Sequence, residues 1–247
     1  MQPIEDIRRS GIRLSGAWVR LTMAAGLLGA VLMTSGWILA GFLQPASYSW
    51  TAQEISDLGA LTAHHARVWN LADSLSGVLI AAFAVGLYRI VGSRRSGRIA
   101  ALSVGVVGIG SVLDGFLRED CPLSTSAACR RRAETVGLSW HHQAHDIESI
   151  VVFAAMLIGP FMLAKVFRRA NELRGLRAFS LEVGIALSAA TGAYLALSGR
   201  AGGGVAERAM ALIYSGWVAV LAIAMLRRPQ AAPRESAPEV RVAVDDA

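Results

Sequence analysis

Charged residues are scarce in this chain of 247 residues: they make up 17% of it, whereas 54% of the residues are hydrophobic. The sequence has only two cysteines and seven prolines, and it contains no low-complexity stretch that fills the chain. This composition excludes a disordered, collagenous or coiled-coil protein. A mean hydropathy of +0.47 also excludes an ordinary soluble domain. We therefore expect a compact protein with several membrane-spanning segments.

The net charge of +6 does not indicate a nucleic-acid partner. Lys and Arg gather beside the apolar stretches of the sequence, as charges that orient a membrane protein do. The basic residues therefore describe the topology of the chain, and we expect no nucleic acid among its ligands.

Six apolar runs are long enough to cross a bilayer. A hydrocarbon core of about 30 Å needs about 20 residues of helix, and residues 21–43 supply 23 residues without a charge. Barrel strands would instead alternate in polarity over about ten residues. The sequence predicts an all-α bundle of six membrane-spanning helices at about 21–43, 68–89, 99–117, 147–167, 178–197 and 209–226.

The distribution of basic residues predicts the orientation of these helices. Of the 24 Lys and Arg residues, 17 lie in the N-terminal 20 residues, in the turns at 89–98 and 164–177, or in the tail from Arg227. Because cytoplasmic loops carry the excess of basic residues, we expect both termini in the cytoplasm of a cell-membrane protein. Residues 1–20 then form a basic segment before an uncleaved first helix, and residues 227–247 form a disordered tail.

Histidine and cysteine occur only in the segments that this topology places outside the cell: His64, His65, Cys121, Cys129, His141, His142 and His145. On an oxidising side of the membrane, two nearby cysteines usually form a disulfide. A zinc site is the alternative, but the spacing of the cysteines matches no common zinc motif. We expect a disulfide that stabilises its loop by about 2.5 kcal/mol.

Polar side chains continue from the outer loops into one face of the second span and one face of the fourth. The first face consists of Asn70, Asp73, Ser74 and Gly77, and the second consists of His141, His145, Glu148 and Ser149. Asp114 lies one turn before the outer end of the third span. At 1.5 Å per residue, Asp73, Asp114 and Glu148 lie at similar depth, within about 10 Å of the outer interface. Ionisable groups in a membrane are costly and face a partner or a wet cavity. We expect one shared outer cavity.

Two chemistries fit this set of residues. His141 and His145, one helical turn apart, can direct two ring nitrogens at a divalent metal such as zinc, with Asp114 as an acidic third ligand. Without a metal, a carboxylate and an imidazole in a half-buried cavity suit acid–base catalysis. In both cases Asp73, Asp120 and Glu148 would orient the reacting groups or bind polar atoms of the substrate.

A purely structural role is the alternative to both chemistries. Helix ends at headgroup level are wet, so a carboxylate one turn inside can pair with Arg67, Arg118 or Arg208 and only orient the bundle. Glu207 and Arg208 either form part of the outer cavity or mark the start of the sixth helix, and we expect the latter.

Four short segments carry a family resemblance: EISDLGA (54–60), GFLRED (115–120), HDIES (145–149) and ERAMALI (207–213). They resemble the bacterial and archaeal membrane proteins called domain of unknown function 998, and the likeness spans most of residues 20–226. The resemblance implies a six-helix fold and identifies Ser56, Asp120, His145 and Arg208 as matched positions. It implies no activity.

A second and fainter likeness concerns residue types alone. His141 and His145 give an HxxxH pattern, with Asp114 and Ser74 available nearby. This is similar to the membrane hydrolases that include alkaline ceramidases and adiponectin receptors, which use Ser, Asp and three His around zinc. That group has seven helices and carries its HxxxH on the last one, so the likeness is an analogy.

The sequence favours an integral-membrane enzyme that acts on a lipid or isoprenoid substrate in a cavity at the outer interface. The reaction would be metal-assisted hydrolysis or acid–base chemistry, including acid-initiated isomerisation or cyclisation. Membrane lipids are the expected partners. A non-enzymatic lipid-binding, accessory or small transport protein is the alternative, although a transporter would carry polar groups through to the inner side.

Overall fold

The computed structural model describes residues 16–168 and 173–227, and all regular secondary structure in these residues is helical. Six helices are long and apolar enough to cross a membrane: α2 (Gly16–Phe42), α3 (Ala66–Val91), α4 (Arg95–Asp114), α6 (Trp140–Phe167), α7 (Arg174–Leu197) and α8 (Gly203–Leu226). A 3-10 turn η1 (Ser56–Gly59) and a short helix α5 (Ala127–Thr135) lie between them. The predicted all-α fold with six membrane-spanning helices is confirmed.

The ends of the helices differ from the predicted spans where polar residues continue the helix. α6 begins at Trp140 instead of residue 147, because Ser139 caps it by accepting a hydrogen bond from the backbone N–H of His142 at 3.3 Å. α4 ends at Asp114, three residues before the predicted end. The predictions for most of the basic N-terminal segment and for the disordered tail fall on residues 1–15 and 228–247, which lie outside the described residues.

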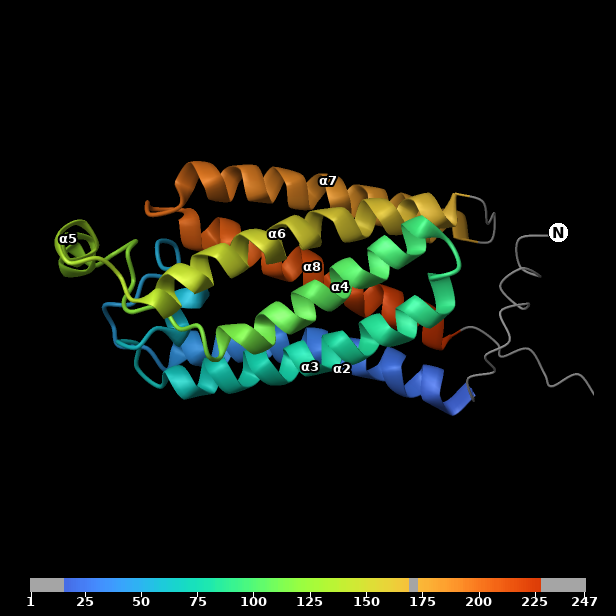
Figure 1. Cartoon of the computed structure of the whole chain (residues 1–247), viewed down its shortest axis with the longest axis horizontal. Coiled ribbons are helices and arrows are strands. Elements are labelled where there is room, and N and C mark those ends of the chain that lie inside the picture. The colour runs from blue at the N-terminus through green and yellow to red at the C-terminus, as the bar shows by residue number, and fades with distance from the viewer. Residues whose placement is uncertain (1–15, 169–172, 228–247) are drawn as a thin grey trace, which may run out of the picture.

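The six long helices form a closed ring in which each helix packs against two neighbours, in the order α2, α3, α4, α6, α7, α8 and back to α2. The helices run roughly along one axis, and η1, α5 and the longer connections gather at one end (Figure 1). We call this the polar end and define it as residues 43–65, 115–139 and 198–202. α2 begins and α8 ends at the opposite end of the bundle.

Close contact between small residues holds the helices together. Apolarity alone gives little driving force between helices in lipid, so backbones approach where side chains are small. The backbones of α3 and α4 approach each other closely: a Cβ atom on Gly77 would lie 2.5 Å from the carbonyl oxygen of Gly108. Large buried side chains, among them Phe83, Leu187 and Trp217, fill the interior.

Residues 44–65, which we call the pinned loop, are tied to the last two helices. Glu54 accepts hydrogen bonds from the hydroxyl of Tyr194 at 2.7 Å and from that of Ser198 at 3.0 Å. The backbone N–H of Ile55 donates to the Glu207 carboxylate on α8. These bonds hold η1 over the end of the bundle.

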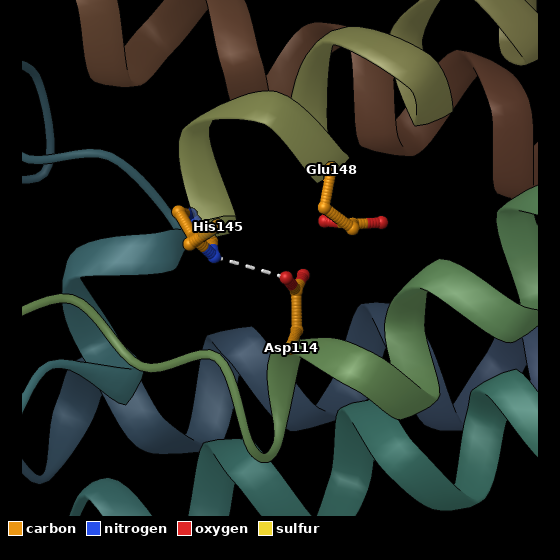
Figure 2. Close-up of side chains that lie close together, drawn as sticks. All are labelled: Asp114, His145 and Glu148. Atoms are coloured by element: carbon orange, nitrogen blue, oxygen red, sulfur yellow. Dashed lines mark ion pairs between the residues drawn. The ribbon is translucent and has the colours of Figure 1, made fainter. Parts of the chain in front are cut away.

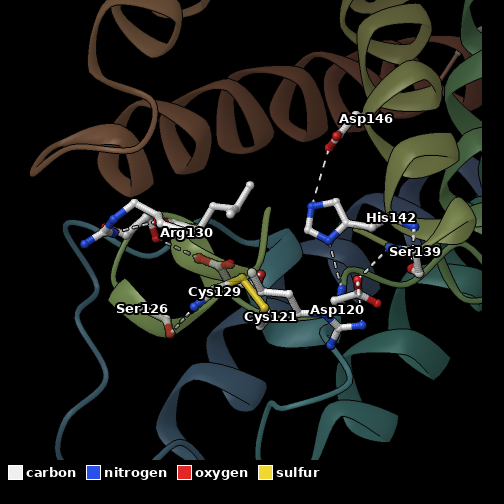
Figure 3. Close-up of a disulfide and its surroundings, with 12 residues drawn as sticks. Asp120, Cys121, Ser126, Cys129, Arg130, Ser139, His142 and Asp146 are labelled. Atoms are coloured by element: carbon white, nitrogen blue, oxygen red, sulfur yellow. Dashed lines mark hydrogen bonds and ion pairs between the residues drawn. A yellow bond between two sulfur atoms is a disulfide. The ribbon is translucent and has the colours of Figure 1, made fainter. Parts of the chain in front are cut away.

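A disulfide joins Cys121 and Cys129, as the sequence predicts (Figure 3). It links the loop after α4 to the first turn of α5, where Ser126 caps the helix by accepting from the N–H of Cys129 at 3.1 Å. The hydroxyl of Ser124 in this loop donates to Asp57 at 3.1 Å. The disulfide loop and the pinned loop therefore form one connected cover.

Candidate functional site

Three side chains meet within the bundle next to the polar end: Asp114, His145 and Glu148, which we call the triad. Asp114 is the last residue of α4, and His145 and Glu148 lie one turn apart on α6. Figure 2 shows the three side chains directed toward one another. The His145 Nδ1 atom lies 3.0 Å from Asp114 Oδ1, and one nitrogen or oxygen atom from each residue lies within 4.8 Å of the others.

Glu119 contacts the other side of the His145 ring. Its Oε1 atom lies 3.1 Å from His145 Nε2. Burial raises the pKa of Glu119, but the hydrogen bond and the charge of His145 outweigh burial and hold this pKa below its usual value. His145 therefore lies between two carboxylates, one on each ring nitrogen.

Glu119 was not among the site residues predicted from the sequence, although its neighbour Asp120 was. The two acids follow each other in a segment without helical periodicity, so spacing does not say which one points inward. Both residues lie close to the end of α4, and this position does not distinguish Glu119 from Asp120.

Asp73 and Glu148 add negative charge to the same region. Asp73 on α3 is 1% exposed and interacts electrostatically with Asp114, Glu148 and His145. Ser111 is the hydrogen-bonding neighbour of the Asp73 carboxylate, but neither oxygen of Asp73 makes a well-aligned hydrogen bond to a described residue, and the same is true of Glu148 Oε1. Buried polar atoms without such a partner are rare and call for an explanation. For Glu148, which lines the cavity described next, a ligand in the site would provide one.

A cavity of about 80 Å³ opens beside the triad. Its polar side is formed by Ser56, Asp114, His145, Glu148 and Glu207. Its inner side is largely apolar and is formed by Met33, Ile80, Val107, Met156 and Met210. A volume of this size holds several waters or a small group of a ligand. Glu207 thus contributes to the cavity wall, which is the less favoured of the two positions considered for it from the sequence.

The structure does not bring His141 into the triad. In the described part of the chain, its Nδ1 atom contacts Ser139 Oγ at 3.0 Å and the carbonyl oxygen of Arg118, and its Nε2 atom lies 3.7 Å from Asp120. His141 is one helical turn closer to the end of the bundle than His145, where the chain after α4 passes α6. The four-residue spacing therefore places the two histidines beside different acids.

Asp120 holds the start of α6 against the loop after α4. Its Oδ2 atom accepts a hydrogen bond from the N–H of Ser139 at 2.8 Å, and its own N–H donates to His142 Nδ1 at 2.9 Å (Figure 3). These two bonds fix the chain next to Glu119. Asp120 therefore positions Glu119 and α6 relative to each other and does not reach the triad itself.

Two of the arginines considered as neutralising partners bind backbone carbonyls instead. Arg118 donates to the carbonyl oxygens of Gly59 at 2.9 Å and Ala60 at 3.1 Å. Arg208 donates to the carbonyl oxygens of Gln53 at 2.6 Å and Gly204 at 2.8 Å and to the hydroxyl of Tyr48. These contacts do not support the alternative in which Arg118 and Arg208 pair with the carboxylates of the triad in a purely structural role.

Asp120→Asn is expected to weaken the fold at neutral pH more than in acid. Burial raises the pKa of Asp120, but the N–H and hydroxyl of Ser139, followed by the charges of Arg132 and His141, outweigh it and hold the pKa below its usual value. A carboxylate with a lowered pKa stabilises the fold above the pKa of the unfolded chain, about 3.9, and this stabilisation is lost as the pH falls through the lower pKa of the folded state.

We expect the variant to lose on the order of 1–3 kcal/mol at pH 7 and to approach the wild type as the pH is lowered toward 3. Unfolding of both proteins in detergent across this range checks the expectation. Glu134→Gln, an exposed acid on α5, serves as the control. An equal loss at every pH would show that the carboxylate charge of Asp120 is not involved.

Comparison with known proteins gives one match. The family described as "Protein of unknown function (DUF998)" matches residues 8–224, which include all six membrane-spanning helices nearly to the end of α8. No curated protein and no solved structure matches the chain. The predicted resemblance to this family is thus confirmed, and the chain belongs to the DUF998 family of multi-pass membrane proteins.

Proposed function

We propose that this protein is an integral-membrane enzyme that hydrolyses a lipid or isoprenoid substrate at the polar end of the bundle. The observation that carries the proposal is the position of His145, which lies between Asp114 at 3.0 Å and Glu119 at 3.1 Å beside a largely apolar cavity. Perturbed acid and imidazole groups that converge on a cleft are typical of catalytic sites.

Each acidic group of the site has a role in this reaction. Glu119 fixes the orientation of the imidazole and stabilises its positive charge, as the carboxylate of a catalytic triad does. The other ring nitrogen faces Asp114, and Glu148 lies beside them. These groups would take a proton from a water molecule, whose oxygen attacks an ester or amide carbon, and would return a proton to the leaving oxygen or nitrogen.

The cavity suits a substrate that arrives from the bilayer. Its polar side would hold the bond to be cleaved, and its apolar side would hold part of a hydrocarbon chain. His145 and Met156 line the cavity from the same helix, eleven residues apart, so the lining extends about 16 Å along α6. The basic residues at the opposite end support a position of the site on the outer face of the cell membrane, because cytoplasmic segments carry the excess of basic residues.

Lipid turnover in a defined membrane tests the proposal. The wild-type protein, reconstituted in nanodiscs that contain a bacterial lipid extract, is expected to consume one lipid class and to release its hydrolysis products, as measured by mass spectrometry. His145→Ala and Asp114→Asn are expected to slow the reaction by about 100-fold or more. His64→Ala, which alters an exposed histidine outside the triad, should leave the rate unchanged. Retention of a lipid without turnover would identify a binding protein instead.

A further inference from the structure

We infer that the triad binds a divalent transition-metal ion, with Asp114, His145 and Glu148 as ligands and Glu119 as the carboxylate that orients His145. The inference deepens the proposed function by naming a cofactor for the same site, and it rests on that function only for the role of the ion. With the ion bound, the imidazole of His145 would be a neutral ligand and not the proton acceptor of the acid–base reaction, so the two mechanisms are alternatives for one site. It also replaces the ligand set expected from the sequence, because Glu148 takes the place of His141.

The distances within the triad fit a shared ion. Two ligand atoms that are each about 2.0–2.2 Å from zinc lie about 3–4 Å apart. His145 Nδ1 and Asp114 Oδ1 are 3.0 Å apart, and all three ligand atoms lie within 4.8 Å of one another. The side chains point to a common centre from α4 and α6 (Figure 2). The Glu148 carboxylate would have to move closer for all three separations to fall in this range.

Each ring nitrogen of His145 faces a carboxylate. The Nε2 atom lies 3.1 Å from Glu119 Oε1 and 3.5 Å from Ser149 Oγ, and the Nδ1 atom lies 3.0 Å from Asp114 Oδ1. The Nδ1 atom and Asp114 Oδ1 make no well-aligned hydrogen bond within the described part of the chain. A histidine ligand usually donates its second N–H to a carboxylate, which directs the lone pair of the other nitrogen to the metal. Glu119 is positioned for that role when Nδ1 binds the ion.

Charge gives a separate reason for a cation. Asp73, Asp114, Glu119 and Glu148 lie around the imidazole of His145. No Lys or Arg side chain of the described residues lines the cavity beside the triad, and Arg118 lines the smaller pocket on the Glu119 side. Excess negative charge in a region of low dielectric constant needs a counter-ion or protons. A mixed nitrogen and oxygen ligand set favours zinc or a similar transition metal over calcium or magnesium.

A side chain outside the triad also points to a ligand. Tyr214 on α8 lines the same cavity and is 4% exposed, yet its hydroxyl has no hydrogen-bond partner among the described residues. A buried hydroxyl without a partner costs free energy. The bound ion with its waters, or a substrate beside it, would supply that partner. The ion itself would act as a Lewis acid toward the bond to be cleaved.

Zinc binding to the full-length, tag-free protein tests the inference. The protein is purified in detergent, treated with a chelator and titrated with zinc chloride against a chromophoric zinc indicator, and the bound metal is counted by mass spectrometry. We expect one zinc ion per chain. His145→Ala should abolish binding, Glu148→Gln and Asp114→Asn should weaken it at least tenfold, and Glu119→Gln should weaken it about 10–100-fold.

Two control variants test whether the loss of zinc binding is specific to the triad. His141→Ala removes the histidine of the same helix that lies outside the triad, and His64→Ala removes an exposed one; both should bind zinc as the wild type does. Gel filtration and a non-reducing gel that shows the Cys121–Cys129 disulfide verify folding of every variant. Wild-type protein that binds no more zinc than His145→Ala, or a loss in His141→Ala as large as in Glu148→Gln, would overturn the inference.

The outcome is separable from that of the proposed function. Turnover that depends on His145 but not on zinc would support the acid–base enzyme and reject the metal site. Stoichiometric zinc bound through the triad without turnover of any lipid would support the metal site and reject the enzyme.

Discussion

Replacement of Gly108 by leucine is expected to separate α3 from α4 and to prevent stable folding. A Cβ atom at Gly108 would lie 2.6 Å from the backbone nitrogen of Ala81 and 2.8 Å from the carbonyl oxygen of Gly77. Both are backbone atoms, which cannot move aside as a flexible side chain can. Overpacking of this kind costs about 3 kcal/mol or more when backbones must shift.

The measurement is the fraction of protein that remains monodisperse after heating in detergent. Gly216→Leu is the matched control, because a Cβ atom on this glycine of α8 meets no atom within 4 Å. The control should behave as the wild type does. The thermal midpoint is the temperature at which half of the protein is no longer monodisperse. Equal thermal midpoints for Gly108→Leu and Gly216→Leu would show that the close approach of α3 and α4 is not needed for stable folding. Since Asp114 is the last residue of α4, the Gly108 variant should also lose the geometry of the triad.

Arg208→Met is expected to release the pinned loop and to cost about 3 kcal/mol or more. Arg208 is 7% exposed, and its guanidinium lies 5.4–5.9 Å from the ring centres of Trp37, Tyr48 and Trp50. Its hydrogen bonds satisfy the carbonyl oxygen of Gln53 and two further buried oxygens. Methionine fills a similar volume but removes the donor to the Gln53 carbonyl oxygen and to the Tyr48 hydroxyl, whereas the Gly204 carbonyl keeps its intrahelical bond from the backbone N–H of residue 208.

Hydrogen exchange of backbone amides in residues 48–57 should increase strongly in Arg208→Met. Arg208→Lys is expected to fall between the variant and the wild type, because lysine keeps the charge but not the planar fork of donors. Arg200→Met, an exposed arginine before α8, is the control. Exchange that stays slow in Arg208→Met would mean that Glu54 and Ile55 hold the loop without the guanidinium.

The membrane-spanning helices could be predicted from the sequence because the bilayer sets their length and requires them to be apolar. The first residues of the helices were harder to predict. The first two turns of α6, with His141, His142 and His145, are too polar for a hydropathy window although a capped helix includes them. α5 has only nine residues with mostly polar side chains, and the disulfide that ties it to the preceding loop sets its position.

The residue types of the candidate site and their depth in the membrane could be predicted from the sequence. The contacts that each side chain makes could not. Asp114, His145 and Glu148 were expected in one cavity, since helical spacing fixes their height in the membrane. The choice between His141 and Glu148 depends on the path of the chain after α4, which no periodicity describes. The role of Arg208 depends on Gln53, a residue 155 positions away, and such contacts leave no local pattern.

The anchoring of the pinned loop also sets an order of events during biosynthesis. The helices of a multi-pass protein are synthesised and inserted in sequence, N-terminal ones first. The backbone of Ile55 must then wait for Glu207, which is made 152 residues later. A nascent chain that has inserted five helices still lacks the α8 wall of the cavity and the anchor above it, so the enclosed pocket is completed only when the final helix leaves the translocon.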